Sequence, residues 1–269
     1  MSTKPETCVN LVLCWHMHQP WYRESQRGDY RLPWVYLHAL KDYADMAAHL
    51  EAHPKMRCVV NFTPVLLEQI DDYAVQFREH LKSGKRFAEP LLNLLAGVDA
   101  IPPDAAARAE IVRACRRAHA PQMIDVYPGF RGLFEMVMSL DGKDVDASRL
   151  TYMNDQFFID LLSWYHLAWL GHSLKQLPRV KGLLGTDGTF SAEARRELLE
   201  IMSEAFDRLL DRYRILADRG QIELSMTPYG HPIVPLLIDI DAMHCSLPEA
   251  KGPEAATYPG GLERARWHM

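Results

Sequence analysis

Two histidines separated by one residue, His16 and His18, follow a short apolar run near the start of the chain. Because side chains alternate across a strand, both imidazoles are predicted to point to the same side. Gln19 and Trp21 follow at once, and the indole of Trp21 offers a flat apolar surface on which a sugar ring can stack. Imidazole, amide and indole groups together suit a hydroxyl-rich ligand, which a few directional polar groups can orient.

Two other interpretations of the histidine pair stay open. The imidazoles could simply end a strand and hydrogen-bond to the backbone, or they could be two ligands of a metal ion. The pair has no third ligand close to it in sequence. We therefore expect no tightly bound metal, and no cofactor.

Polar residues also end two later apolar runs. In the second run Asn61 is the single polar side chain after Val59 and Val60. Glu223 lies on the third run, and Thr227 and His231 follow it. A glutamate on an apolar strand is costly if it is buried without a partner, so Glu223 faces a polar cavity, has a fixed partner or lies at an exposed edge. Asn61 could equally be a turn-forming residue before Pro64.

The elements that carry these residues indicate an α/β fold. Apolar runs at 8–15, 57–62 and 221–226 are typical of strands in a parallel sheet, and we expect them to be adjacent and parallel. Strands separated by helices favour parallel pairing. Helical spacing predicts helices over residues 34–52, 65–82, 87–96, 104–119, 129–139, 148–170 and 191–219.

Composition excludes several classes of protein. Thirty basic and 35 acidic residues give a net charge of −5, so no global basic field exists for nucleic acid. The chain has no run of about 18 apolar residues that could cross a membrane. Its start lacks the pattern of a secretory signal. Five scattered cysteines indicate free thiols, and we expect a cytoplasmic protein.

The motifs together resemble glycoside hydrolase family 57, in particular its α-amylase- and α-mannosidase-like members. His16-Met17-His18-Gln19-Pro20 matches the family's first signature, and Gly220 to Leu237 resembles its second. The stretch from Arg31 to Ile70 is also similar. Three resemblances in the right order span most of the chain.

The resemblance implies an incomplete (β/α)7 barrel that acts on α-linked glucans or related carbohydrates with retention of configuration. Residues 1–269 would be the N-terminal part of one barrel domain with three parallel strands and a helical insertion at about 65–219. The sugar-binding residues implied by it, or by their position on the strands, are His16, His18, Gln19, Trp21, Asn61, Glu223, Thr227 and His231.

The chain departs from the family in one respect. The resemblance implies a glutamate nucleophile and an aspartate acid/base, and neither signature is found before Met269. We therefore expect both downstream, no catalytic residue in this chain, and no activity of this chain alone. A non-catalytic carbohydrate-binding module is one alternative. A metal-dependent polysaccharide deacetylase is another, since His49 and His53 have a ligand-like spacing, although no aspartate pair follows the first strand.

Overall fold

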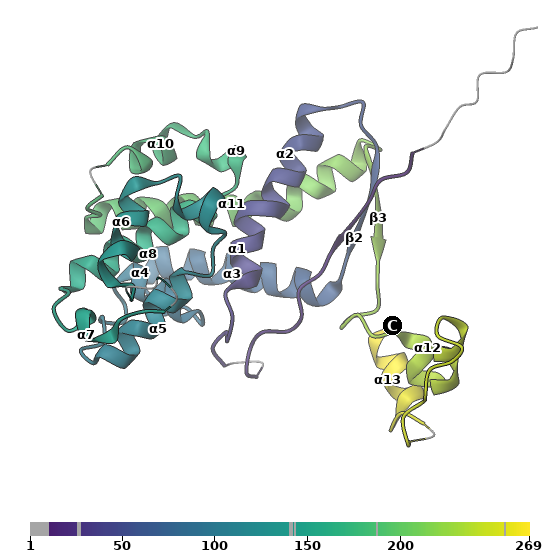
Figure 1. Cartoon of the computed structure of the whole chain (residues 1–269). Coiled ribbons are helices and arrows are strands. Elements are labelled where there is room, and N and C mark those ends of the chain that lie inside the picture. The colour runs from purple at the N-terminus through teal and green to yellow at the C-terminus, as the bar shows by residue number, and fades with distance from the viewer. Residues whose placement is uncertain (1–10, 26–27, 140–141, 143, 187, 256) are drawn as a thin grey trace, which may run out of the picture. The chain divides into compact units, whose positions relative to one another are not determined.

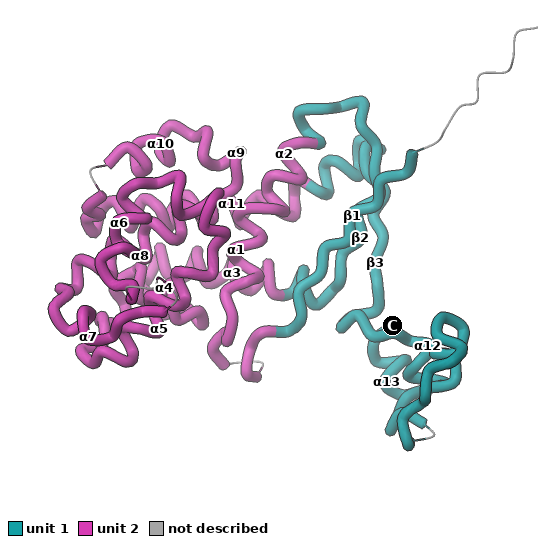
Figure 2. Tube along the Cα trace, in the orientation of Figure 1, with its two compact units in different colours: residues 1–21, 50–68, 213–269 teal, residues 22–49, 69–212 magenta. Residues whose placement is uncertain are grey.

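The computed structural model describes residues 11–25, 28–139, 142, 144–186, 188–255 and 257–269. The chain forms two compact units (Figure 2). The first consists of Met1–Trp21, Leu50–Glu68 and Tyr213–Met269, and the second of Tyr22–His49 and Gln69–Arg212. None of the helices in the described part of the chain is long and apolar enough to cross a membrane.

A three-stranded parallel sheet organises the first unit. Its strands are β1 (Cys14–Met17), β2 (Cys58–Phe62) and β3 (Ile222–Met226), and β2 lies between the other two. Both pairs are parallel, so the expected adjacency and direction of the three strands are confirmed. The observed α/β architecture with three parallel strands agrees with the predicted fold class.

The bounds predicted for the first strand were wrong. β1 begins at Cys14 rather than at Cys8, and it continues past Trp15 to Met17. Residues 8–10 lie outside the described residues, while Leu11 and Val12 are outside the strand and 81% and 75% exposed. The carbonyl of Leu13 still accepts a hydrogen bond from the N–H of Val59, but β2 begins at Cys58, so Leu11 and Val12 have no residue of β2 to pair with.

The strand register places polar side chains in one row across the sheet. His16 lies opposite Asn61, and Asn61 lies opposite Ser225. On the other face Met17 and Phe62 are buried, and the Phe62 ring meets the Tyr213 ring edge-on at 5.1 Å between centroids. This face therefore carries the apolar packing, and the row of His16, Asn61 and Ser225 belongs to the opposite face.

Besides the sheet, the first unit contains the end of α2 (Ala44–Ala52), the start of α3 (Pro64–Ser83), the end of α11 (Ala192–Asp218) and a C-terminal cluster of short helices (Figure 1). The buried side chain of Gln221 donates hydrogen bonds to the carbonyls of Leu50 and His53, which ties the start of β3 to the end of α2. The C-terminal cluster consists of α12 (Val234–Ile238), the short helix η3 (Ile240–Cys245) and α13 (Gly261–His268).

The second unit is almost entirely helical. Its elements, with those shared with the first unit, are α1 (Trp34–His38), η1 (Ala39–Tyr43), α2, α3 (Pro64–Ser83), α4 (Pro90–Ala96), α5 (Ala105–Cys115), η2 (Ala120–Ile124), α6 (Pro128–Val137), α7 (Ala147–Leu150), α8 (Asp155–Trp169), α9 (His172–Lys175), α10 (Pro178–Leu184) and α11 (Ala192–Asp218). The predicted helix over 148–170 is in fact α7 and α8, because Asn154 caps α8 by accepting a hydrogen bond from the N–H of Phe157. α8 is buried almost throughout.

Four cysteines, Cys14, Cys58, Cys115 and Cys245, are free thiols in the structure, and Cys8 lies outside the described residues. Cys58 and Cys115 are buried within the two units, where they behave as small apolar side chains.

Candidate functional site

A chain of hydrogen bonds links the three strands at the polar row. The Nδ1 atom of His16 lies 2.7 Å from Oδ1 of Asn61, and the Nδ2 group of Asn61 donates to Oγ of Ser225 at 3.0 Å. Asn61 is buried, at 8% exposure, and the oxygen and the NH2 group of its side-chain amide each bond to a neighbouring strand. Since an amide oxygen accepts only, Nδ1 of His16 carries the hydrogen, which leaves Nε2 as an acceptor in the neutral ring.

Three imidazoles gather beyond this row. The ring centroids of His16 and His18 lie 6.0 Å apart, and the ring of His231 lies 4.8 Å from each of them. The rings of His18 and His231 are stacked. Burial lowers the pKa of His18, and the nearby His231 and His16 lower it further. The neutral form of His18, which can both donate and accept a hydrogen bond, is therefore favoured.

The loop after β3 carries His231 into this cluster. The N–H of His231 donates to the carbonyl of Pro228 at 2.8 Å, and His231 adopts a left-handed backbone conformation with φ of 57°. This conformation is unfavourable for a residue other than glycine, so the contacts around His231 must stabilise it. The carbonyl of Tyr229 accepts from the N–H of Val65, and the Tyr229 hydroxyl hydrogen-bonds to Glu68.

Helix α13 holds the other side of this loop. The N–H of Tyr229 donates to the carbonyl of His268 at 2.8 Å, and the N–H of Gly230 donates to Nδ1 of His268 at 3.1 Å. A Cβ atom at Gly230 would lie 2.9 Å from Cε1 of His268, so any other residue there would have to displace the His268 ring. The ring of Tyr229 also meets Trp267 edge-on at 5.2 Å.

Thr227 follows β3 directly. Its N–H extends the ladder to the carbonyl of Phe62. Its hydroxyl is buried and has no hydrogen-bond partner among the described residues. An unsatisfied buried hydroxyl is costly, and a ligand hydroxyl would satisfy it.

The remaining predicted residues lie around this cluster. Glu223 is exposed and sits one row behind Ser225 on the same face, opposite Val59 of β2. Of the three possibilities that the sequence left for Glu223, the observed position is the exposed edge of the sheet. Gln19 and Trp21 are half-buried in the segment after β1. The structure thus gathers the rings of His16, His18 and His231 and links Asn61 to His16, whereas Glu223 stands apart.

Two participants were missed by sequence reasoning. Ser225 shares a face with Glu223 in the alternation of β3, so that pattern could have found it, and the register puts it beside Asn61. His268 lies 38 residues from the loop that it contacts, and no local pattern signals the contact.

In the part of the chain that the structure describes, no three His, Cys, Asp or Glu side chains are arranged to hold a metal ion. The three imidazoles present ring nitrogen atoms, with the buried hydroxyl of Thr227 on the adjoining strand end. Such a set can hydrogen-bond several hydroxyl groups of one sugar ring.

In a comparison with protein families, the model of glycosyl hydrolase family 57 matches residues 12–252. No curated protein and no solved structure matches the chain.

Proposed function

Because the chain belongs to glycosyl hydrolase family 57, we propose that it is the sugar-binding N-terminal portion of a retaining glycoside hydrolase or glucanotransferase that acts on α-linked glucans or related carbohydrates. The observation that carries the proposal is the contact of His16, His18 and His231 at the carboxyl ends of parallel strands. In α/β folds this end of the sheet is where ligands bind.

The residues have distinct roles in this proposal. His16, held by Asn61, and His18 hydrogen-bond hydroxyl groups of the sugar at the scissile bond, and His231 closes the other side of the same subsite. Thr227 offers its unpaired hydroxyl. Two more residues, Gln19 and Trp21, extend the contact surface beyond β1, with the indole stacking on a sugar face. Glu223 contributes from the edge of the sheet.

The catalytic pair comes from outside these residues. A retaining mechanism needs two carboxyl groups about 5–5.5 Å apart across the scissile bond. We assign the nucleophile and the acid/base to neither Glu223 nor any other residue of this chain, because neither of the two family signatures that would carry them is found in it.

The outer edge of β3 is where a further barrel strand would add. β3 ends the sheet, and its apolar residues Leu224 and Met226 are 51% and 69% exposed. Edge strands present unpaired backbone groups that pair readily with another strand. A strand placed there would bring its own carboxyl end beside Ser225 and Thr227, next to the histidine cluster. The predicted barrel, with residues of about 65–219 as its helical insertion, is part of this proposal.

Binding and turnover test the proposal separately. Calorimetric titration of the 269-residue chain with maltooligosaccharides should show binding that His18→Ala weakens and that Glu249→Gln, an exposed control in the C-terminal loop, leaves unchanged. Reducing-sugar release from the same oligosaccharides should be absent. Turnover by this chain that Glu223→Gln abolishes would contradict the assignment of the catalytic pair.

Metal analysis and the binding test separate the alternatives. One stoichiometric zinc per chain, lost in His16→Ala, would favour a deacetylase. A complete lack of saccharide binding would contradict both the sugar subsite and a non-catalytic carbohydrate-binding module.

A further inference from the structure

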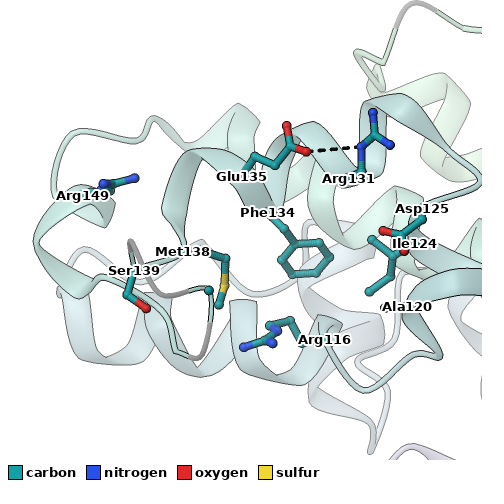
Figure 3. Close-up of a pocket in the computed structure, with 11 residues that line it drawn as sticks. Arg116, Ala120, Ile124, Asp125, Arg131, Phe134, Glu135, Met138, Ser139 and Arg149 are labelled. Carbon is teal, nitrogen blue, oxygen red and sulfur yellow. Dashed lines mark ion pairs between the residues drawn. The ribbon is translucent and has the colours of Figure 1, made fainter.

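A surface pocket of the second unit lies among η2, α6 and the segments that follow α5 and α6 (Figure 3). Its volume is about 520 Å³. This is within the range of roughly 300–1,000 Å³ that small-molecule sites occupy. None of its lining residues belongs to the histidine cluster or to the motifs of the first unit.

The floor of this pocket is apolar. The side chains of Ile124 and Phe134 reach it from η2 and α6, and they are 7% and 6% exposed. Met138, half-buried directly after α6, lines it beside Phe134. The ring of Phe130 meets that of Phe134 at 5.1 Å, which fixes Phe134 from within the unit. A ligand that covers this floor gains free energy by removing apolar surface from water.

Three guanidinium groups surround the floor. In Figure 3, Arg116, Arg149 and the ion pair of Arg131 with Glu135 lie around the central ring of Phe134. Arg149 is positioned by Asp146 at 3.2 Å and by the carbonyl of Met136 at 3.4 Å. Guanidinium groups are planar, permanently charged and suited to binding carboxylate and phosphate through two hydrogen bonds.

The arginines of the lining are the groups that can take an anion, and each of them has a carboxylate nearby. Arg131 pairs with Glu135, Arg149 pairs with Asp146, and the charge of Asp144 interacts with Arg116, so a ligand anion competes with these carboxylates. The Arg131–Glu135 pair spans 3.3 Å, and its side chains are 51% and 68% exposed. Exposed ion pairs of this kind contribute little free energy. A ligand anion can therefore replace the carboxylate of Glu135 at the guanidinium group of Arg131.

We propose that this pocket binds a small organic anion with an apolar body, namely an aryl or alkyl phosphate monoester or carboxylate. The apolar body covers Phe134 and Met138, and the anionic group pairs with Arg116 or Arg149 at the rim. The site is independent of the sugar subsite, so it holds whether or not the histidine cluster binds saccharides.

Ligand-observed NMR and calorimetry on the full chain test this proposal with phenyl phosphate, benzoate, phenol and inorganic phosphate as probes. Phenyl phosphate should bind at least tenfold more tightly than phenol, which lacks the charge, and than inorganic phosphate, which lacks the ring. Benzoate decides between the two anion classes: if it matches phenyl phosphate the site takes carboxylates as well, and if it does not the site takes phosphate monoesters. Binding of phenyl phosphate should weaken with added salt.

Variants locate the site. Arg116→Gln and Arg149→Gln should each weaken phenyl phosphate binding severalfold, whereas Arg196→Gln, an exposed arginine of α11 that pairs with Glu200, should leave it unchanged. Met138→Ser should weaken phenyl phosphate and leave inorganic phosphate unaffected. Equal binding of phenol and phenyl phosphate, equal effects of the Arg116 and Arg196 variants, or no binding of either organic anion at millimolar concentration would each overturn the proposal.

Discussion

The backbone N–H of Gly230 donates a hydrogen bond to the imidazole Nδ1 of His268 at 3.1 Å. This contact joins the last turn of α13 to the residue before His231. Because His231 has a left-handed backbone and reaches the other two imidazoles only from this loop, the position of one site histidine depends on a histidine outside the site. His268 is a positioning residue in this arrangement.

Replacing His268 by alanine should release the loop and move His231 away from His18. The pKa of His18, which burial and the neighbouring imidazoles lower, should then rise toward its usual value. NMR titration of the histidine Cε1–H signals measures this shift without any saccharide. Arg266→Ala, on the exposed side of the same helix, is the matched control. An unchanged titration of His18 in the His268 variant would show that the loop keeps its position without the contact to His268.

A Cβ atom at position 230 should conflict with the same imidazole. The distance of 2.9 Å to Cε1 of His268 is too short for a carbon contact, so Gly230→Ala should displace the His268 ring and lower the free energy of unfolding. Because Gly230 is exposed and His268 half-exposed, the loss should be smaller than the about 1–3 kcal/mol that overpacking costs in a core. The cost should be smaller when His268 is also alanine. Urea unfolding of the two single variants and the double variant measures this coupling. Strictly additive costs would argue against a direct clash.

Removing the amide of Asn61 should affect both stability and binding. Asn61→Ala deletes the hydrogen bonds to His16 and Ser225, and each such bond contributes about 0.5–1.5 kcal/mol. Urea unfolding should therefore show a larger loss than Ser225→Ala, which deletes only one of the two bonds. Saccharide affinity should fall in the Asn61 variant because the His16 ring is no longer oriented. A smaller loss for Asn61→Ala than for Ser225→Ala would contradict this description.

His166 should make the protein sensitive to acid. Its buried imidazole lies between the carbonyl of Leu162 at 2.7 Å and the hydroxyl of Tyr36 at 3.0 Å, and burial lowers its pKa to about 4. The unfolded chain takes up a proton at this residue from pH 6.5 downward, whereas the folded chain does not, so its contribution to stability is lost as the pH falls from 6.5 to 4. The loss amounts to about 3 kcal/mol. Urea unfolding of the natural chain and of His166→Gln across this range should give curves that converge toward low pH.

Glu89 should act in the opposite direction. It is 2% exposed, accepts hydrogen bonds from the N–H of Leu91 and the hydroxyl of Tyr73, and burial raises its pKa to about 8. The folded chain keeps this proton between pH 4.5 and 8 while the unfolded chain loses it, so stability falls as the pH rises through this range. Glu89→Gln, which mimics the protonated acid, should gain stability relative to the natural chain from pH 5 to pH 8. A constant difference between the two unfolding curves would show that Glu89 is ionised in the folded state.

Local patterns in the sequence determined the helices and strands, and they placed His16 and His18 together in the site. Alternation along a strand places His16 and His18 on one side, and apolar runs closed by proline or polar residues predicted three strands whose adjacency and parallel direction the structure confirms. Helical spacing predicted the long helices α3 and α11 to within about one residue at either end. These signals are local, because the period of a strand or a helix is written in consecutive residues.

The tertiary structure alone decided how these pieces meet. The register of β1, β2 and β3 makes Asn61 the bridge between His16 and Ser225, residues that lie 45 and 164 positions from it. The available length of β2 sets where β1 begins, and packing of α13 sets where His231 points. Contacts over such separations depend on the relative placement of whole elements, and the residues at either end carry no local pattern that specifies the partner.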